Sequence, residues 1–278
     1  MRVRILMITY NRPAYTELAL RQLCETSPEH ARITVWDNNS NPELRAVLKK
    51  FENHPRIEQI IYNPTNDRLH GPTKWFWDNT RDAEFLCKVD DDCLMPPGWC
   101  ETLEAAHRDI PQAGILGCWR FLDEDFDEKL ARRKIQSFGA HQLLRNCWVE
   151  GSGYLMKRAV LDKIGNLLPK ESFTSYCVRA AANGFINGWY YPFLYQEHMD
   201  DPRVPSSGIR TEEDFQRLRP LSANTFKIEN RSQWIDRLKY SAWVLQACSY
   251  DPRYYSGWRY QIRKVLGRVT GKRIVPRA

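Results

Sequence analysis

The sequence predicts an α/β fold in which a mostly parallel sheet is flanked by helices, with a C-terminal helical extension. Between residues 1 and 118, short β-type runs alternate with longer stretches of helical pattern, which is typical of parallel strands joined by crossover helices. Prolines stand in the first turn of two expected helices, at Pro13 and Pro42. The length of 278 residues suits one large α/β domain with an appendage, or two small domains.

The N-terminal half supplies the expected parallel strands. We place these strands at 3–9, 32–37, 57–62, 84–89 and 113–118, with helices at 12–26, 42–51, 72–80 and 97–109. In sheets of this kind, ligands bind outside the carboxyl ends of the strands. Side chains that follow these strands are therefore the first candidates for a functional site.

The pattern becomes mixed after residue 118. Strand-like pieces lie within 135–156, and helices fit 158–164, 171–183 and 231–247. Glycines and prolines between Pro202 and Pro220 predict a long loop. These changes divide the chain into a domain of residues 1–200, with halves 1–118 and 119–200, and a loop with a basic helical extension at residues 201–278.

The chain is basic, and its positive charge is concentrated near the C-terminus. Lysines and arginines outnumber acidic residues 41 to 34, which favours an anionic partner such as a nucleotide, nucleic acid or acidic membrane surface. Within residues 253–277, a helix fits 258–269, with a basic face opposite five apolar residues: Trp258, Ile262, Val265, Leu266 and Val269. This apolar stripe lies either in a membrane interface or on the protein's own core, and the sequence leaves both open.

The cysteines and the absence of apolar spans indicate an intracellular setting. Several of the eight cysteines fall inside apolar runs, such as Cys87 and Cys118, which indicates buried free thiols. Cys93 and Cys100 lack the spacing of a zinc ribbon. Residues 1–8 lack the features of a signal peptide, and no apolar stretch is long enough to span a bilayer. We expect a cytoplasmic protein, with peripheral contact to the inner face of the membrane left open.

The strongest local signal is the run Asp90-Asp91-Asp92, which directly follows an apolar strand. Adjacent carboxylates repel one another, and burial at a strand end increases this cost, so a neutralising cation is the expected compensation. Carboxylate oxygens suit Mg²⁺ or Mn²⁺. The alternative is an exposed acidic turn ahead of the helix that begins near Pro97.

Three segments, in this order, resemble the motifs of family 2-type glycosyltransferases, which have the Rossmann-type GT-A fold. They are Thr9-Tyr10-Asn11-Arg12, Trp36-Asp37-Asn38-Asn39-Ser40 and Asp90-Asp91-Asp92, each at the end of an expected strand. The resemblance covers residues 1–200. It implies a nucleotide-binding half at 1–118, an acceptor half at 119–200, and metal-dependent sugar transfer from a nucleotide-diphosphate donor, most often UDP, to a glycan, glycolipid or other acceptor.

The resemblance also implies a nucleotide pocket made by the first two motifs. Thr9, Tyr10 and Arg12 would line the base and ribose pocket, and Asp37 and Asn39 would contact the nucleotide. These roles make physical sense, because Tyr10 can stack on a base, Asp37 can accept from a ring N–H, and Arg12 can meet a phosphate. The alternative for the second motif is a plain turn that caps the next helix.

The resemblance implies that the metal lies beside the donor diphosphate. Asp90 would contact the sugar or ribose and Asp92 would ligate Mn²⁺ or Mg²⁺, with Asp91 between them as a further donor-binding residue. Lys74 would reach the donor, or is a solvated surface lysine. His198 ends a strand-like run, a place from which related enzymes supply a metal ligand, whereas a lone histidine is more often structural.

The acidic pair that such enzymes use to deprotonate the acceptor hydroxyl is missing at its usual place. Aligned on Arg179, Ser172 and Phe173 stand where the two acids are expected. Glu171 is one residue away, and Glu150 competes because small residues beside it let an acceptor approach. Third choices are Asp200 and Asp201, and the stereochemistry of transfer stays open.

Two other functions compete with sugar transfer. Asp90 followed by Asp92 also resembles the start of haloacid-dehalogenase-type phosphatases, with Asp90 as nucleophile and Asp200 and Asp201 as a late acid pair. A non-enzymatic basic module would instead bind nucleic acid or membrane through its aromatic tail, although no nucleic-acid motif accompanies it. The three ordered motifs favour sugar transfer, and we expect no nucleic-acid partner.

Overall fold

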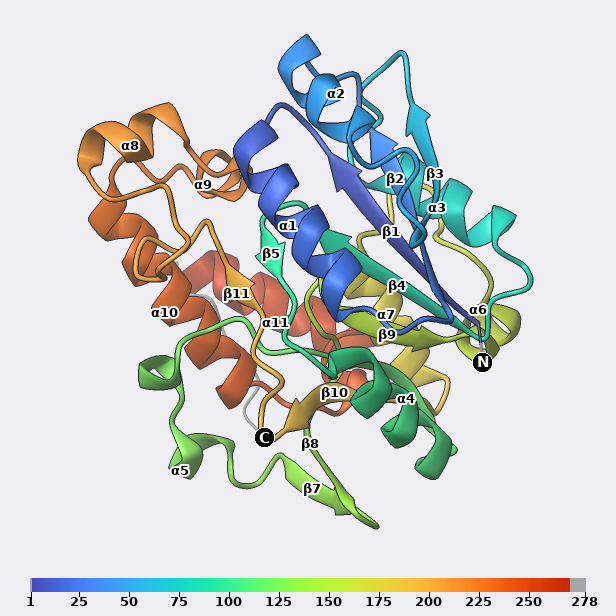
Figure 1. Cartoon of the computed structure of the whole chain (residues 1–278). Coiled ribbons are helices and arrows are strands. Elements are labelled where there is room, and N and C mark those ends of the chain that lie inside the picture. The colour runs from blue at the N-terminus through green and yellow to red at the C-terminus, as the bar shows by residue number, and fades with distance from the viewer. Residues whose placement is uncertain (1, 271–278) are drawn as a thin grey trace.

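A nine-stranded mixed sheet forms the centre of the molecule (Figure 1). The structure is a computed structural model and describes residues 2–270. The strands follow the order β3-β2-β1-β4-β9-β6-β10-β8-β7. Their bounds are Val3–Thr9 (β1), Ala31–Asp37 (β2), Ile57–Tyr62 (β3), Phe85–Asp90 (β4), Ala113–Gly117 (β6), Ile135–Phe138 (β7), His141–Asn146 (β8), Tyr154–Lys157 (β9) and Ile186–Tyr191 (β10).

The predicted α/β fold is confirmed, with a parallel N-terminal half and a mixed remainder. Strands β3, β2, β1 and β4 are parallel neighbours, as the alternation of strand and helix patterns predicted. Strand β9 lies antiparallel between β4 and β6, and β8 pairs antiparallel with β10. The carboxyl ends of β1, β2 and β4 therefore share one edge of the sheet.

Helices cover both faces of the sheet (Figure 1). Side chains alternate along β1, so Ile5 faces a core shared with α1, α2 and α4, whereas Leu6 faces a core shared with α3, α6, α7 and α10. Both predicted first-turn prolines begin helices, and Asn41 caps α2 by accepting from Leu44 N at 3.0 Å. The bounds are Pro13–Thr26 (α1), Pro42–Lys49 (α2), His70–Asn79 (α3), Trp99–Asp109 (α4), Glu128–Ala131 (α5), Arg158–Ile164 (α6), Phe173–Ala182 (α7) and Arg231–Ala247 (α10).

The long loop predicted between Pro202 and Pro220 contains a helix, so that prediction is wrong in part. Thr211 caps helix α8 (Glu212–Arg217), and Asp214 bonds back to the Thr211 backbone in a capping box. This pair satisfies backbone N–H groups that the start of a helix would otherwise leave unpaired. The capping box therefore stabilises a helix in a segment whose flanking prolines favour a loop. A short helix α9 (Leu221–Thr225) follows, and α10 packs into the same core as the sheet.

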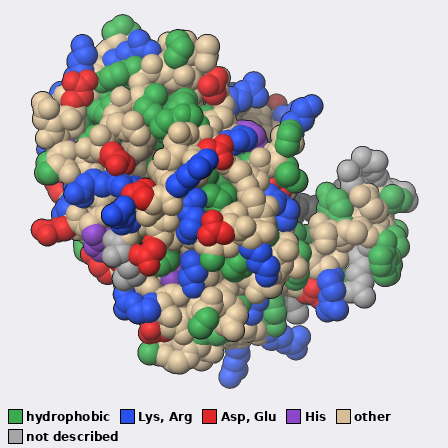
Figure 2. Space-filling model, turned by 90° about the vertical axis from the view of Figure 1, so that its right-hand side faces the viewer, with side chains coloured by type: hydrophobic (Ala, Val, Ile, Leu, Met, Phe, Trp, Pro, Cys, Tyr) green, Lys and Arg blue, Asp and Glu red, His purple; other side chains and the backbone are tan. Residues whose placement is uncertain are grey.

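Helix α11 (Gly257–Thr270) confirms the helix predicted over 258–269. The exposed fractions of Trp258, Ile262 and Val265 are 69%, 51% and 56%, so these side chains are not buried in the protein's own core. Figure 2 shows hydrophobic side chains on a lobe that projects from the body on the side where α11 lies. The side chains of the predicted basic face, Arg259, Arg263, Lys264 and Arg268, and that of Val269 lie outside the described part of the chain. None of the helices within residues 2–270 has the length and apolar content needed to cross a membrane.

Candidate active site

The three sequence motifs meet at one edge of the sheet. The parallel register places Thr9 beside Asp37 and Ile8 beside Asp90, so the loops that follow β1, β2 and β4 emerge together. Hydrogen bonds then join these loops, from Tyr10 N to Asp91 Oδ2 at 3.4 Å and from Asn11 N to Ser40 Oγ at 3.2 Å. The strand register therefore brings the three segments together.

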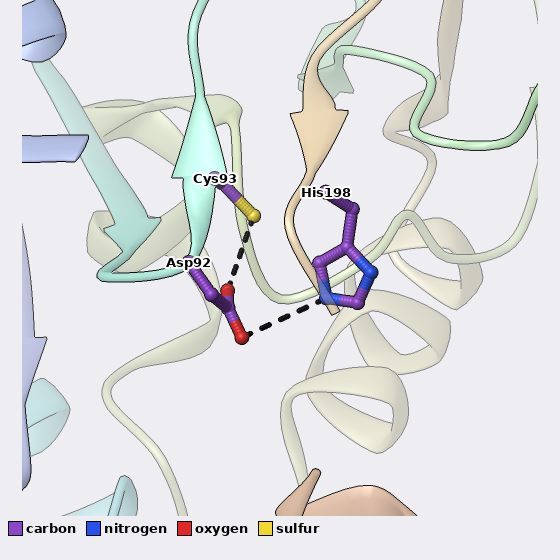
Figure 3. Close-up of side chains that lie close together, drawn as sticks. All are labelled: Asp92, Cys93 and His198. Atoms are coloured by element: carbon purple, nitrogen blue, oxygen red, sulfur yellow. Dashed lines mark hydrogen bonds and ion pairs between the residues drawn. The ribbon is translucent and has the colours of Figure 1, made fainter. Parts of the chain in front are cut away.

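A small second sheet brings His198 to the acidic run. Strand β5 (Cys93–Leu94) pairs antiparallel with β11 (Glu197–His198), placing His198 opposite Cys93. The Nε2 atom of His198 lies 3.7 Å from Oδ2 of Asp92, and both side chains are largely buried (Figure 3). The ligand atoms of Asp92, Cys93 and His198 all lie within 4.8 Å of one another. The two residues predicted to hold the metal are thus neighbours, although they are 106 residues apart in the chain.

The protonation states of Asp92 and His198 suit a divalent metal. Burial alone would raise the pKa of Asp92, but the neighbouring His198 and Arg12 outweigh burial and hold this pKa below its usual range. Burial, aided by Arg120, lowers the pKa of His198 to about 4, so its imidazole is neutral at neutral pH. An ionised carboxylate and a neutral imidazole are the forms that ligate metals. This oxygen and nitrogen pair is compatible with Mn²⁺.

Cys93 is the member of this cluster that the sequence did not identify as part of the site. Its side chain is 1% exposed, and burial raises the pKa of the thiol well above its usual value. The thiol donates to Asp92 Oδ1 at 3.4 Å. In the metal-free state the protonated thiol of Cys93 therefore orients Asp92, and the thiol would have to lose its proton to ligate a metal.

The three acids of the run have different environments. Asp91 faces inward, accepts from Thr16 Oγ1 at 3.1 Å, and has its pKa raised to about 7 by burial and then by Asp92. Asp90 forms an ion pair with Lys88, and its side chain is 35% exposed. Asp91 therefore bonds within the protein, whereas Asp90 is partly accessible, and donor contact by either of them stays a prediction.

Two arginines lie against the predicted metal ligands. Arg12 Nη1 donates to Asp92 Oδ2 at 3.0 Å, and both Nη atoms of Arg12 bond the carboxylate of Asp200. Arg120 Nη1 lies 3.3 Å from Nε2 of His198. The sequence analysis did not identify Arg120, although its position three residues after the end of β6, at the same edge of the sheet, was a usable signal.

The predicted nucleotide pocket contains both buried and accessible side chains. Thr9 and Asp37 are fully buried, and the Asp37 oxygens accept from Ser40 N at 3.1 Å and from Arg45 Nε at 3.0 Å. Tyr10 is 37% exposed, and Asn39 is exposed with a φ of 61°. Tyr10 and Asn39 are therefore accessible, whereas Asp37 bonds within the loop that carries Asn39, and nucleotide contact by these residues stays a prediction.

Lys74 lies on the exposed surface of α3. Its ammonium group bonds Asp78 Oδ2 at 2.6 Å, four residues along the helix, and both side chains are 49% exposed. This is an ordinary helix surface pair. Donor contact by Lys74 stays a prediction.

The two candidates for the catalytic base differ in how their carboxylates are paired. Glu171 accepts from Arg179 Nε at 2.9 Å and Nη2 at 2.7 Å and from Leu168 N at 2.9 Å; burial opposes ionisation, but these bonds lower its pKa. Glu150 pairs with Arg120 through Oε1 at 2.6 Å, while its buried Oε2 has no hydrogen-bond partner. Burial raises the pKa of Glu150 despite Arg120. Glu150 therefore differs from Glu171 in having one buried oxygen without a hydrogen-bond partner and a raised pKa, both of which favour proton uptake, and the identity of the base stays a prediction.

Comparisons with known protein structures support the same fold. The structure is similar to a mannosyltransferase, PcManGT, from Pyrobaculum calidifontis in complex with GDP-Man and Mn²⁺, with a TM-score of 0.59, 15% identity, and coverage of 97% of this chain and 80% of that one. It is also similar to residues 1–349 of S. aureus TarS in complex with UDP-GlcNAc, with a TM-score of 0.56, 13% identity and coverage of 88% and 72%. GalNAc-T7 with UDP, GalNAc and Mn²⁺ matches with a TM-score of 0.55, 12% identity and coverage of 71% of this chain but 44% of that one. At these identities, the similarities establish a shared GT-A fold.

The sequence comparisons give the family. No curated protein sequence matched this chain. The family model described as "Glycosyl transferase family 2" matches residues 4–165, more than half of the sequence, and includes all three strand-end motifs. The chain is therefore a glycosyltransferase that belongs to glycosyl transferase family 2.

Proposed function

We propose that this chain transfers a sugar from a nucleotide-diphosphate donor, UDP-linked in the first instance, to a hydroxyl of a glycan or glycolipid. The observation that carries the proposal is the contact between Asp92 and His198, which the β5–β11 pairing creates beside the nucleotide-binding motifs. Similar structures contain GDP-Man or UDP-GlcNAc, and two contain Mn²⁺. Family membership favours this function over the phosphatase and the non-enzymatic module.

In this proposal, Asp92 and His198 hold Mn²⁺ or Mg²⁺, which would neutralise charge on the departing nucleoside diphosphate. Tyr10 and Asn39 contact the nucleoside from the loops after β1 and β2, and Asp90 contacts the sugar or ribose. Residues 1–118 serve the donor, residues 119–200 the acceptor, and residues 201–278 form an extension. The extension supports the site, because Trp234 Nε1 donates to Asp200 O at 2.7 Å.

The proposed proton acceptor is Glu150. Its partnerless Oε2 would take the proton of the acceptor hydroxyl as the hydroxyl oxygen attacks the anomeric carbon and the bond to the diphosphate breaks. Arg120 holds the other oxygen and fixes the orientation of the carboxylate. A single displacement of this kind inverts the anomeric configuration.

The donor class is testable by nucleotide binding. We expect Mn²⁺ together with one of UDP, GDP, dTDP or CDP to raise the melting temperature, with UDP favoured. At a ligand concentration of about 100 times Kd, the expected gain is about 2.7 kcal/mol, or roughly 5–10 °C for a chain of this size. Thermal-shift and calorimetric titrations, with and without Mn²⁺, measure it. A lack of response to every diphosphate with metal would contradict the proposed donor site.

The extension also has a proposed partner, an anionic membrane surface at the inner face of the cytoplasmic membrane. Helix α11 exposes Trp258, Ile262 and Val265, and its sequence places basic residues between them. Ile262→Glu should lower the affinity for vesicles that contain anionic lipid, measured by co-sedimentation, by about tenfold or more. The substitution removes an apolar side chain that would be buried in the membrane and adds a charge that anionic lipid repels. The exposed control Leu221→Glu, on α9, should bind as the unchanged protein does. Equal binding by Ile262→Glu and the unchanged protein would exclude α11 as the contact.

A further inference from the structure

The guanidinium of Arg12 bonds the same oxygen that would ligate the metal. Asp92 Oδ2 accepts from Arg12 Nη1 at 3.0 Å and lies 3.7 Å from His198 Nε2. The side chains of Arg12 and Asp92 are 22% and 14% exposed, so water screens this group only weakly. A divalent cation on Asp92 and His198 would repel a guanidinium on that oxygen at close range. Metal binding and the Arg12–Asp92 contact therefore oppose one another.

Arg12 has a second carboxylate partner, Asp200, which lies close enough to Asp92 to hydrogen-bond it as well. Its two Nη atoms bond the two oxygens of Asp200, and the side chain of Asp200 is 6% exposed. The backbone of this segment is fixed by Trp234 Nε1, which bonds Asp200 O, and by Tyr15 Oη, which bonds Met199 O at 3.1 Å. The Arg12 guanidinium also lies 4.4 Å above the Tyr15 ring. Arg12 can thus lose Asp92 and stay attached to Asp200.

We propose that Arg12 is the resident cation of the site, neutralising Asp92 before a metal binds, and that Asp200 is the positioning residue that retains Arg12 when a metal takes its place on Asp92. This inference rests on the proposed function. It accounts for the burial of Asp92 beside two other acids, because an unpaired buried carboxylate is costly. The other arginine at the site, Arg120, faces His198, so changes at Arg12 report on the Asp92 contact.

Manganese affinity without nucleotide tests the proposal. Electron paramagnetic resonance titrations of free Mn²⁺ should show that Arg12→Gln binds the ion about tenfold more tightly than the unchanged protein, because a charge-assisted hydrogen bond no longer competes. Asp200→Asn should bind it about threefold to tenfold more weakly, because Arg12 is then left with Asp92 as its charged partner. Equal affinity in Arg12→Gln and the unchanged protein would overturn the inference.

The matched control is Arg203, an arginine with similar pairing in the same segment. It bonds Asp125 Oδ2 at 2.6 Å and Asp201 Oδ2 at 2.7 Å, and within residues 2–270 it forms no ion pair with Asp92. Arg203→Gln removes the same charge and should leave Mn²⁺ affinity within about twofold of the unchanged value. A gain equal to that of Arg12→Gln would mean that net charge, and not competition at Asp92, sets the affinity.

A double mutant separates positioning from ligation. If Asp200 acts through Arg12, adding Asp200→Asn to Arg12→Gln should change the Mn²⁺ affinity less than twofold. If Asp200→Asn weakens Mn²⁺ binding equally in the unchanged protein and in Arg12→Gln, then Asp200 acts on the ion directly and is not a positioning residue for Arg12.

A second test measures the unchanged protein, and a variant is needed only to assign the signal. The ¹⁵Nε–H signal of Arg12, assigned by its loss in Arg12→Lys, should shift when diamagnetic Mg²⁺ is added, and the signal of Arg203 should not. An unshifted Arg12 signal at saturating Mg²⁺ would overturn the inference. If the unchanged, folded protein binds neither Mn²⁺ nor Mg²⁺, the metal part of the proposed function fails and this inference fails with it.

Discussion

Replacing Asp92 with Asn is expected to lower the rate of sugar transfer by about a hundredfold to a thousandfold and to abolish the metal-dependent part of nucleotide binding. Asp92 is the carboxylate that lies beside His198, and its lowered pKa keeps it ionised. An amide keeps the shape of the side chain but removes the charge that would hold the ion. Loss of one preorganised electrostatic contact to developing charge typically costs about 10²–10³ in kcat. Nucleotide release from the donor identified by the binding screen, with and without Mn²⁺, measures the change.

Asp82→Asn is the matched control for this substitution. Asp82 precedes the same strand, β4, at the edge opposite the site, and it pairs with Arg2 and Arg4. The substitution removes one negative charge and leaves the proposed metal ligands in place, so transfer should stay near the unchanged rate. Similar losses in Asp82→Asn and Asp92→Asn would point to a general effect of charge or folding and would remove Asp92 from the metal site.

The sequence predicted the parallel half of the fold because its signals are local. The runs that form β1, β2 and β4 are continuous and apolar, and each is followed by polar residues that mark its end. Parallel register then places those polar residues together, without any information from elsewhere in the chain. This is why the grouping of Tyr10, Asp37 and Asp92 is predictable from the sequence alone.

The pairings that complete the site are long-range and could not be predicted in the same way. Strand β5 has two residues and is recognisable only through its partner β11, more than a hundred positions later. The bonds from Arg12 to Asp200 span 188 positions, and no periodicity in the sequence indicates them. The insertion of antiparallel β9 between β4 and β6 is also a tertiary choice, since its four residues carry no signal of direction.

The hydrogen-bond partners of individual carboxylates could not be predicted from the sequence either. Asp37 follows its strand as expected, but whether its oxygens meet a ligand or the protein depends on Arg45, one turn into α2. Glu171 lies beside the expected place of an acid, yet its partner Arg179 is two turns away on α7. Residue type and position predict an acid near the acceptor. Only the hydrogen-bond partners of Glu150 and Glu171 distinguish these two candidates for the base.

Glu150→Gln should lower kcat by about 10²–10⁴, the usual contribution of a positioned base, while leaving metal-dependent nucleotide binding unchanged. Glutamine keeps the shape of the side chain but cannot take the acceptor proton. Because the substitution also removes the charge that pairs with Arg120, the melting temperature of the variant is measured alongside its rate. Because burial raises the pKa of Glu150, the rate of the unchanged enzyme should increase with pH until this carboxylate is fully ionised. Steady-state rates measured across pH, with nucleotide affinity measured in parallel, separate the proton step from donor binding.

Glu171→Gln is the control that decides between the two glutamates. Its carboxylate accepts two hydrogen bonds from Arg179, so the substitution removes one partner of a largely buried ion pair. We expect the free energy of unfolding to fall by more than the activation free energy of turnover rises. Arg179 would still donate to Ile164 O and Asn166 O, which limits the damage to the start of α7. If Glu171→Gln instead removes turnover in folded protein while Glu150→Gln retains it, then the acceptor proton goes to Glu171, and the Arg120–Glu150 pair has a structural role.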